Sequence, residues 1–552
     1  MSITKNKIQL SHALLDTSSR ADASKAELSS CWNSLGLYHS TQYVLRLSHS
    51  VHKLVDSATQ KKNKNITWEE IQAFSTYLHE TVHWWQFIGS SMGFIMSMCY
   101  PAEAHSNLEP LQRLAKSKHA MKPLMDWAEA EMRNGKDHTT PDIAEANKAT
   151  NNTLDIAFYR TLIMNAAGIS KIASQNYFES TAHAFSIAYD VTINTLRAVF
   201  DPEAKFLPNP DDWHLEFEKQ KINKKEGFYY GSPITTLPIR GLDIIEGQAR
   251  FTQLQFLSFA AQEKLTIEQA EQDGYLNGEY GNAFRFFLEN TDSKAPELVD
   301  SPLVALFLLL CDIAINPLEG FPKTISNMEN FLLLTDCNHR FIALCTAVKE
   351  NPQIKHHIKE YTKKEYLETA QILTSYCNFE HPYEIPTLIT NWKRDIDSIQ
   401  ALLKEQETFD YSDDNIVIRV LFSHFLTFNL DKYKSPEFFC WPGMHLNSKS
   451  SVIDSEKLWL KNLSLYSDNA DEQTILPRML PGKPEENIMK TFNSFYAANI
   501  VYSIGSQWVM NRGPFDYDFS WLTEREESEV IKDKTKELFE KTYNINPDNI
   551  PH

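Results

Sequence analysis

"TWEEIQAFSTYLHETVHWWQFIG", residues 67–89, is the stretch that decides the fold. Apolar side chains recur along it at spacings of three and four residues, which is the pattern of an amphipathic helix. Thr67 is followed three residues later by Glu70, a pair in which each side chain satisfies a backbone N–H group of the first turn. The sequence therefore predicts a helix from about residue 68. The apolar stripe consists of Ile71, Phe74, Leu78, Val82 and Trp85.

The same periodicity covers most of the chain. We expect a mainly α fold, a large multi-helix body with few short strands. Strand-like alternation is clearest at 228–239 and 500–510, and either segment is equally compatible with an extended loop. The best predicted helices cover 68–88, 141–166, 175–199, 242–264, 303–315, 365–377, 390–406 and 415–428.

Composition indicates a well-packed globular protein. Apolar residues make up 42 % of the 552 residues and aromatic residues 12 %, so the chain can bury a large core. We expect an N-terminal segment at 1–63, a helical domain at 64–290 and a mainly helical C-terminal region at 291–552, with a polar, Pro-containing segment near 290 as the clearest boundary. Within the last region, 429–488 shows little periodicity and is expected to be irregular.

The charge balance disfavours two classes of partner. The formal net charge is −18, which should repel nucleic acid and anionic membranes, and no extended basic patch offsets it. The seven cysteines form no Cys-x-x-Cys pair and lie mostly in apolar runs, so we expect buried, reduced thiols. The first 30 residues do not resemble a secretory signal, and the longest apolar run, Leu303–Ile315, is too short to span a bilayer. We therefore expect a cytoplasmic protein.

Two histidines four residues apart dominate the functional prediction. His79 and His83 are one turn apart on a predicted helix, so both imidazoles can reach a single ion. Zn²⁺ favours two such nitrogens, a third protein ligand and an open position for water. Glu80 points beside the ion, where a carboxylate can take a proton from water. We therefore expect Zn²⁺ as the cofactor, with His79 and His83 as ligands and Glu80 as general base.

This pattern resembles the zincin metallopeptidases, whose His-Glu-x-x-His signature is met by His79, Glu80 and His83. The resemblance covers some twenty residues. Gln86, three residues after the second histidine, gives a variant similar to that of several bacterial zincin-like families. The metzincin continuation is absent, because position 86 is not glycine and position 89 is Gly89 rather than histidine.

The resemblance implies a third ligand, usually a glutamate on a downstream helix. Glu246 is the best candidate, because Gly247 and Ala249 beside it should allow its helix to approach the active helix closely. Arg250 takes the place of the acidic residue usual in gluzincins, and we expect it to orient Glu246.

Other residues remain open as members of the site. The alternative third ligand is Glu179, which also has small neighbours and has His183 one turn later. Tyr229 and Tyr230 precede the Glu246 helix and are candidate helpers for a developing negative charge, although a packing function is favoured for them.

The favoured function is a zinc-dependent peptidase that acts on a peptide or protein substrate. One alternative is a non-catalytic helical binding protein in which the metal is structural or absent. A less favoured one is a di-iron carboxylate protein, because Glu80 and His83 also form Glu-x-x-His. A second such pair is required, and Asp211 with His214 lies in a segment expected to be a Pro-rich loop. The oligomeric state cannot be read from the sequence.

Overall fold

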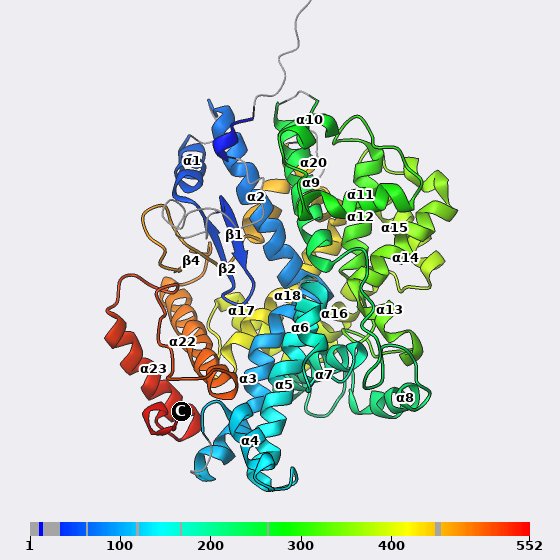
Figure 1. Cartoon of the computed structure of the whole chain (residues 1–552). Helices are drawn as coiled ribbons and strands as arrows, with labels where there is room; N and C mark the ends of the chain where they lie inside the picture. The colour runs from blue at the N-terminus through cyan, green and yellow to red at the C-terminus, as the bar shows by residue number, and fades with distance from the viewer. Residues whose placement is uncertain are drawn as a thin grey trace, which may run out of the picture.

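The structure is a computed structural model of the chain (Figure 1) and describes residues 10–14, 34–61, 65–117, 121–165, 168–261, 264–447 and 454–552. Over these residues the fold is mainly α, as the periodicity predicts.

The helix predicted from residue 68 is α2, Trp68–Gly89. The side chain of Thr67 accepts a hydrogen bond from the Glu70 backbone N–H, and Glu70 Oε2 accepts one from the Thr67 backbone N–H at 2.8 Å. These reciprocal bonds satisfy two backbone donors that the helix itself cannot pair, and they fix where α2 begins. From Leu78 to Gly89 every side of α2 is buried, so it is a central helix rather than a surface one.

Four helices and a small sheet surround α2. It packs against α1, α3, α9 and α18, and strand β1 lies on the side away from α9 (Figure 1). The N-terminal elements are β1 (Gly36–His39), β2 (Val44–Leu47), α1 (His49–Gln60), α3 (Ser91–Ser117), α4 (Leu124–Arg133), α5 (Pro141–Met164), α6 (Ile169–Ala173), α7 (Thr181–Phe200), α8 (Asp211–Ile222), α9 (Gly241–Ala261), α10 (Ile267–Gln272) and α11 (Glu279–Asn290), after a short 3₁₀ turn at His12–Leu14.

The later helices complete the layer on the α9 side and then return past α2 to α3 (Figure 1). They are α12 (Pro302–Ala314), α13 (Phe331–Thr335), α14 (Cys337–Glu350), α15 (Lys363–Cys377), α16 (Glu384–Asp395), α17 (Asp397–Thr408), α18 (Ile416–Lys434), α19 (Pro436–Cys440), α20 (Pro442–His445), α21 (Ser455–Lys461), α22 (Glu485–Met510) and α23 (Ser528–Tyr543). Short 3₁₀ turns lie at Met328–Asn330, Pro352–His356 and Pro547–Asn549.

The described strands form one sheet in the order β1-β2-β3-β4, where β3 is Tyr466–Ser467 and β4 is Leu476–Pro477. β1 and β2 are antiparallel with Gly36 opposite Leu47, β2 and β3 are parallel, and β3 and β4 are antiparallel. The sheet therefore joins chain segments that are more than 400 residues apart in sequence.

Three local predictions differ from the structure. Residues 500–510, expected to be a strand or loop, lie inside α22, because aromatic and β-branched residues there pack as a helix against α3 and α5. The 390–406 segment is two helices that meet at Ile396. Residues 211–214, expected to be a loop, form the first turn of α8. Residues 228–239 contain no described strand and form an irregular connection to α9, which agrees with the alternative of an extended loop.

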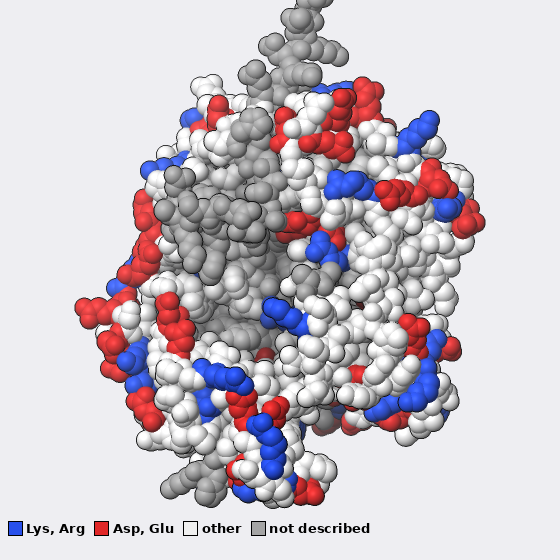
Figure 2. Space-filling view, viewed as in Figure 1, with Lys and Arg blue, Asp and Glu red and all other residues white. Residues whose placement is uncertain are grey.

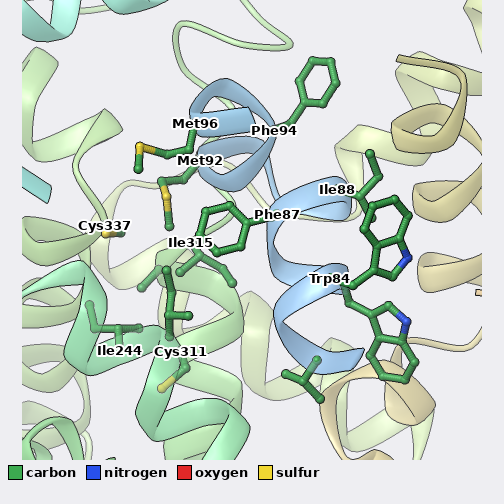
Figure 3. Packing of buried hydrophobic residues seen from close by; sticks show 14 of the residues in the cluster. Trp84, Phe87, Ile88, Met92, Phe94, Met96, Ile244, Cys311, Ile315 and Cys337 are labelled. Atoms are coloured by element: carbon green, nitrogen blue, oxygen red, sulfur yellow. The ribbon is translucent and has the colours of Figure 1, made fainter. Parts of the chain in front are cut away.

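The principal hydrophobic core extends from the N-terminal strands to α22, and a second cluster lies between α3–α5 and α22–α23. Residues before and after position 290 share the principal core, and the division at that position stays a prediction. Figure 3 shows buried side chains of this core that come from the end of α2, the start of α3, α9 and the region around Cys311 and Ile315. The described cysteines are free thiols, and all but the half-buried Cys377 are buried.

In the described part of the chain, no single helix has the length and apolar character needed to cross a membrane, although one pair bent by 83°, Met328–Thr335 with Cys337–Glu350, meets those criteria jointly. On the face in Figure 2, acidic and basic side chains are interspersed rather than segregated.

Candidate metal centre

Two adjacent helices, α2 and α9, place three potential ligands at one buried point. His79 and His83 lie one turn apart on α2, and their Nε2 atoms are 3.1 Å apart. The two rings are nearly perpendicular, with centroids 4.7 Å apart, so the nitrogen atoms converge instead of the rings stacking. The pairing of the histidines follows from helical geometry alone, since residues four apart share a face.

Glu246 on α9 supplies the third atom. Its Oε2 lies 3.3 Å from Nε2 of His79 and 3.3 Å from Nε2 of His83. The ligand atoms of the three residues all lie within 4.8 Å of one another, and all three residues are buried. Two imidazole nitrogens and one carboxylate oxygen form a donor set that Zn²⁺ favours, so the residues present fit such an ion.

Gly247 has a different packing role in the structure from the one expected. Glycine and alanine beside Glu246 were expected to ease contact with α2. A Cβ on Gly247 would instead lie 3.3 Å from the Phe307 ring and 3.4 Å from Cβ of Ala283. Gly247 therefore allows close packing against α11 and α12, on the other side of α9.

Gln86 fixes the orientation of His83. Its Oε1 lies 2.8 Å from Nδ1 of His83, so the imidazole donates its Nδ1–H to the amide oxygen. The amide N–H₂ of Gln86 is held in turn, because Nε2 donates to Gln248 Oε1 at 2.8 Å and to the Ile245 carbonyl at 3.0 Å. This arrangement leaves the Nε2 lone pair of His83 facing the cluster, which is the tautomer a metal needs.

Arg250 lies beside the cluster with its guanidinium stacked on aromatic rings. Its central carbon is 3.9 Å from the Tyr280 ring centroid and 5.2 Å from that of Tyr275. Arg250 also donates to Gln253 Oε1 at 2.8 Å. The hydrogen bond expected from Arg250 to Glu246 stays a prediction. Tyr280, whose ring lies 6.0 Å from that of His79, is a neighbour of the site that no local sequence pattern indicated.

Glu80 is buried beside the cluster and packs against strand β1. A Cβ built on Gly36 would lie 2.6 Å from both Cγ and Oε1 of Glu80. Only a residue without a side chain leaves room for the carboxylate in this position. Gly36 is a further neighbour of the site that sequence reasoning missed, because its 44-residue separation from Glu80 gives no local signal.

The other proposed site residues lie elsewhere. Glu179 pairs with Lys221 and, at 3.7 Å, with Nδ1 of His183, so its charge is used in a separate cluster and it is not part of the ligand group. Tyr230 is 68 % exposed, which does not suit a buried centre. Tyr229 stacks with Lys224, whose ammonium is 4.7 Å from the ring centroid.

Burial and the charges within the cluster shift the pKa values of all three residues. Burial lowers the pKa of His79 to about 3, so this imidazole is neutral. Burial also disfavours the charged form of His83, but the nearby Glu246 carboxylate outweighs it and raises the pKa of His83. Burial disfavours ionisation of Glu246 as well, yet the two histidines hold its pKa well below the usual range. A cation that binds here requires the ligating nitrogen of each imidazole to be unprotonated.

Comparison of the chain with known protein families, curated protein sequences and solved structures finds no match.

Proposed function

We propose that the protein is a zinc-dependent hydrolase of the zincin type, and that it cleaves peptide bonds. One observation carries this proposal: His79, His83 and Glu246 converge within 4.8 Å, while the buried Glu80 lies on the same helix between the two histidines. The sequence motif and the distant carboxylate support it independently of each other, because they are 163 residues apart.

The residues of the chain would divide the chemistry as follows. His79, His83 and Glu246 hold Zn²⁺, which supplies Lewis-acid chemistry when bound. Glu80 accepts a proton from the attacking water and passes it to the leaving amine. Gln86 holds His83 in the required tautomer, and burial of the cluster strengthens each of these interactions by excluding bulk water.

A catalytic function is favoured over a structural one by the number of ligands. A structural zinc site is closed by four protein ligands, whereas the group found among the described residues contains three. A site that only braced α2 against α9 would also have no use for a buried carboxylate at position 80. A cytoplasmic setting belongs to the same proposal and is supported by the free, mostly buried thiols of the described cysteines.

The proposal is tested by metal content and hydrolysis of an unfolded protein substrate, measured on the same preparations. We expect about one zinc per chain in the wild type, loss of the ion in His79→Ala, and a retained ion with hydrolysis lowered about 10²–10⁴-fold in Glu80→Gln. His424→Ala and Glu103→Gln change a half-buried histidine and a buried glutamate outside the ligand group; they are the controls and should keep both properties. Undiminished hydrolysis by Glu80→Gln would contradict the assignment of the base.

A further inference from the structure

A large cavity lies against the face of α2 that points away from α9. Its volume is about 1030 Å³, at the upper end of the range for small-molecule sites. Trp84 and Ile88 form its α2 wall, and Figure 3 shows both side chains pointing away from Ile244 and Ile315. The cavity is therefore separate from the metal cluster, which faces α9. Its other walls come from α16–α18, α21 and the segments around 463–465 and 478–483.

Most of the wall is apolar. Besides Trp84 and Ile88 it includes Leu403, Phe428, Leu463 and Leu465. Leu460, also in the lining, is 50 % exposed and extends this apolar surface to the mouth.

Several polar groups of the wall are satisfied within the protein. Arg478 donates to three backbone carbonyls, those of Leu460, Leu463 and Ser464. Gln406 donates to Thr427 Oγ1, and Asn462 donates to Asp431 and to the Leu458 carbonyl. These groups are already engaged and do not favour pairing with the backbone of a bound peptide, whose N–H and C=O groups would be costly to bury without partners. An aliphatic chain carries no such groups.

The lining carries more basic than acidic residues, although the whole protein is strongly acidic. Six lining residues are lysine or arginine and three are aspartate or glutamate. Lys393, Lys404 and Lys457 are exposed, and within the described ranges none of them forms an ion pair with a carboxylate. An anionic group at the mouth would find three uncommitted ammonium groups, and this charge complementarity indicates the sign of the ligand.

We propose that this cavity binds a single-chain anionic amphiphile of the fatty-acid class. The aliphatic chain lies against Trp84, Ile88 and Phe428, and the carboxylate is held at the mouth by Lys393, Lys404 and Lys457. The site is independent of the proposed hydrolase function, since it uses none of the cluster residues.

The test is calorimetric titration of the full-length protein with dodecanoate below its micellar concentration. We expect saturable binding to the wild type at one site. The methyl ester, which lacks the charge, should bind at least about tenfold more weakly to the same protein. The triple variant Lys393→Glu, Lys404→Glu, Lys457→Glu should weaken dodecanoate binding by about tenfold or more.

Two controls separate this site from nonspecific effects. Lys53→Glu, Lys171→Glu, Lys541→Glu reverses three exposed charges outside the lining and should leave the affinity within about twofold. Leu403→Glu places a carboxylate in the apolar wall and should abolish binding, while its circular dichroism spectrum reports that the fold is kept.

Three results would overturn the proposal. One is no dodecanoate binding by the wild type, and another is equal affinity of the mouth triple variant and the wild type. The third is that the cavity binds an acidic amphipathic peptide or phosphatidylglycerol vesicles more tightly than it binds dodecanoate. The occupant would then be a protein segment or a membrane surface.

Discussion

Glu80 depends for its position on a residue that has no side chain. Because a Cβ at position 36 would overlap Cγ and Oε1 of Glu80, we expect Gly36→Ala to push the carboxylate away from the cluster. If Glu80 is the proposed base, a displacement of about 1 Å should lower catalysis by about 10²-fold, while the proposed ligands His79, His83 and Glu246 are untouched. Hydrolysis and zinc content of Gly36→Ala check this, and loss of zinc together with activity would speak against it.

Gln86 offers a second test, which addresses metal affinity. Gln86→Leu keeps a similar volume but removes the oxygen that accepts from Nδ1 of His83. We expect zinc affinity to fall about 10–100-fold, the usual effect of losing such a partner. Competition with a coloured chelator measures the change. Gln72→Leu, a buried glutamine earlier on α2, is the control, and an equal loss of affinity there would show a general effect on the helix.

The clustering of the proposed site residues could be predicted from the sequence where the information is local. The positions of His79, Glu80, His83 and Gln86 relative to one another follow from the α-helical repeat. Gly36 and Tyr280 could not be found in this way, because only tertiary packing brings β1 and α11 to α2.

The start of α2 is stabilised by a charged group. Glu70 accepts hydrogen bonds from Lys61, Ser57 and the Thr67 backbone, and these bonds lower its pKa to about 2. A depressed carboxylate pKa contributes stability that is complete above about pH 4.5 and is lost as the pH falls towards 2. Glu70→Gln should therefore destabilise the protein at pH 6 and progressively less towards pH 2.

Urea unfolding of both proteins between pH 6 and pH 3 measures this difference. Glu69→Gln, which removes an exposed carboxylate one residue earlier, should show little difference at any pH. If the loss of unfolding free energy in Glu70→Gln stays constant with pH, the negative charge of Glu70 is not the cause of the stabilisation.

Most helices were predictable because their apolar period is visible in the sequence, as for α2, α5, α9 and α12. Residues 500–510 were not, because Val501, Tyr502, Trp508 and Val509 favour strands locally, and burial within α22 overrides that preference. The break between α16 and α17 at Ile396 was also missed, because the helical spacing of apolar residues continues on both sides of it.

A buried ion pair connects α12, in the middle of the chain, to α18, in its C-terminal part. Lys432 Nζ on α18 lies 2.6 Å from Asp312 Oδ1 on α12, and both side chains are 5 % exposed. Tyr366 on α15 donates to Asp312 Oδ2 at 2.7 Å. The sequence showed an aspartate inside an apolar run but not its partner, which is 120 residues away.

Removing one member of this pair should be far more harmful than removing both charges. Lys432→Met leaves the Asp312 carboxylate buried without its cation, and we expect the free energy of unfolding to fall by about 3–5 kcal/mol. Adding Asp312→Asn removes the uncompensated charge and keeps an acceptor for Tyr366, so most of the loss should be recovered. Denaturant unfolding of the two variants gives both values.

Lys490→Met, at the exposed pair with Asp410, is the control and should lower the free energy of unfolding by less than about 1 kcal/mol. Equal losses in the single and double variants would mean that packing around α18, and not the buried charge, sets the cost.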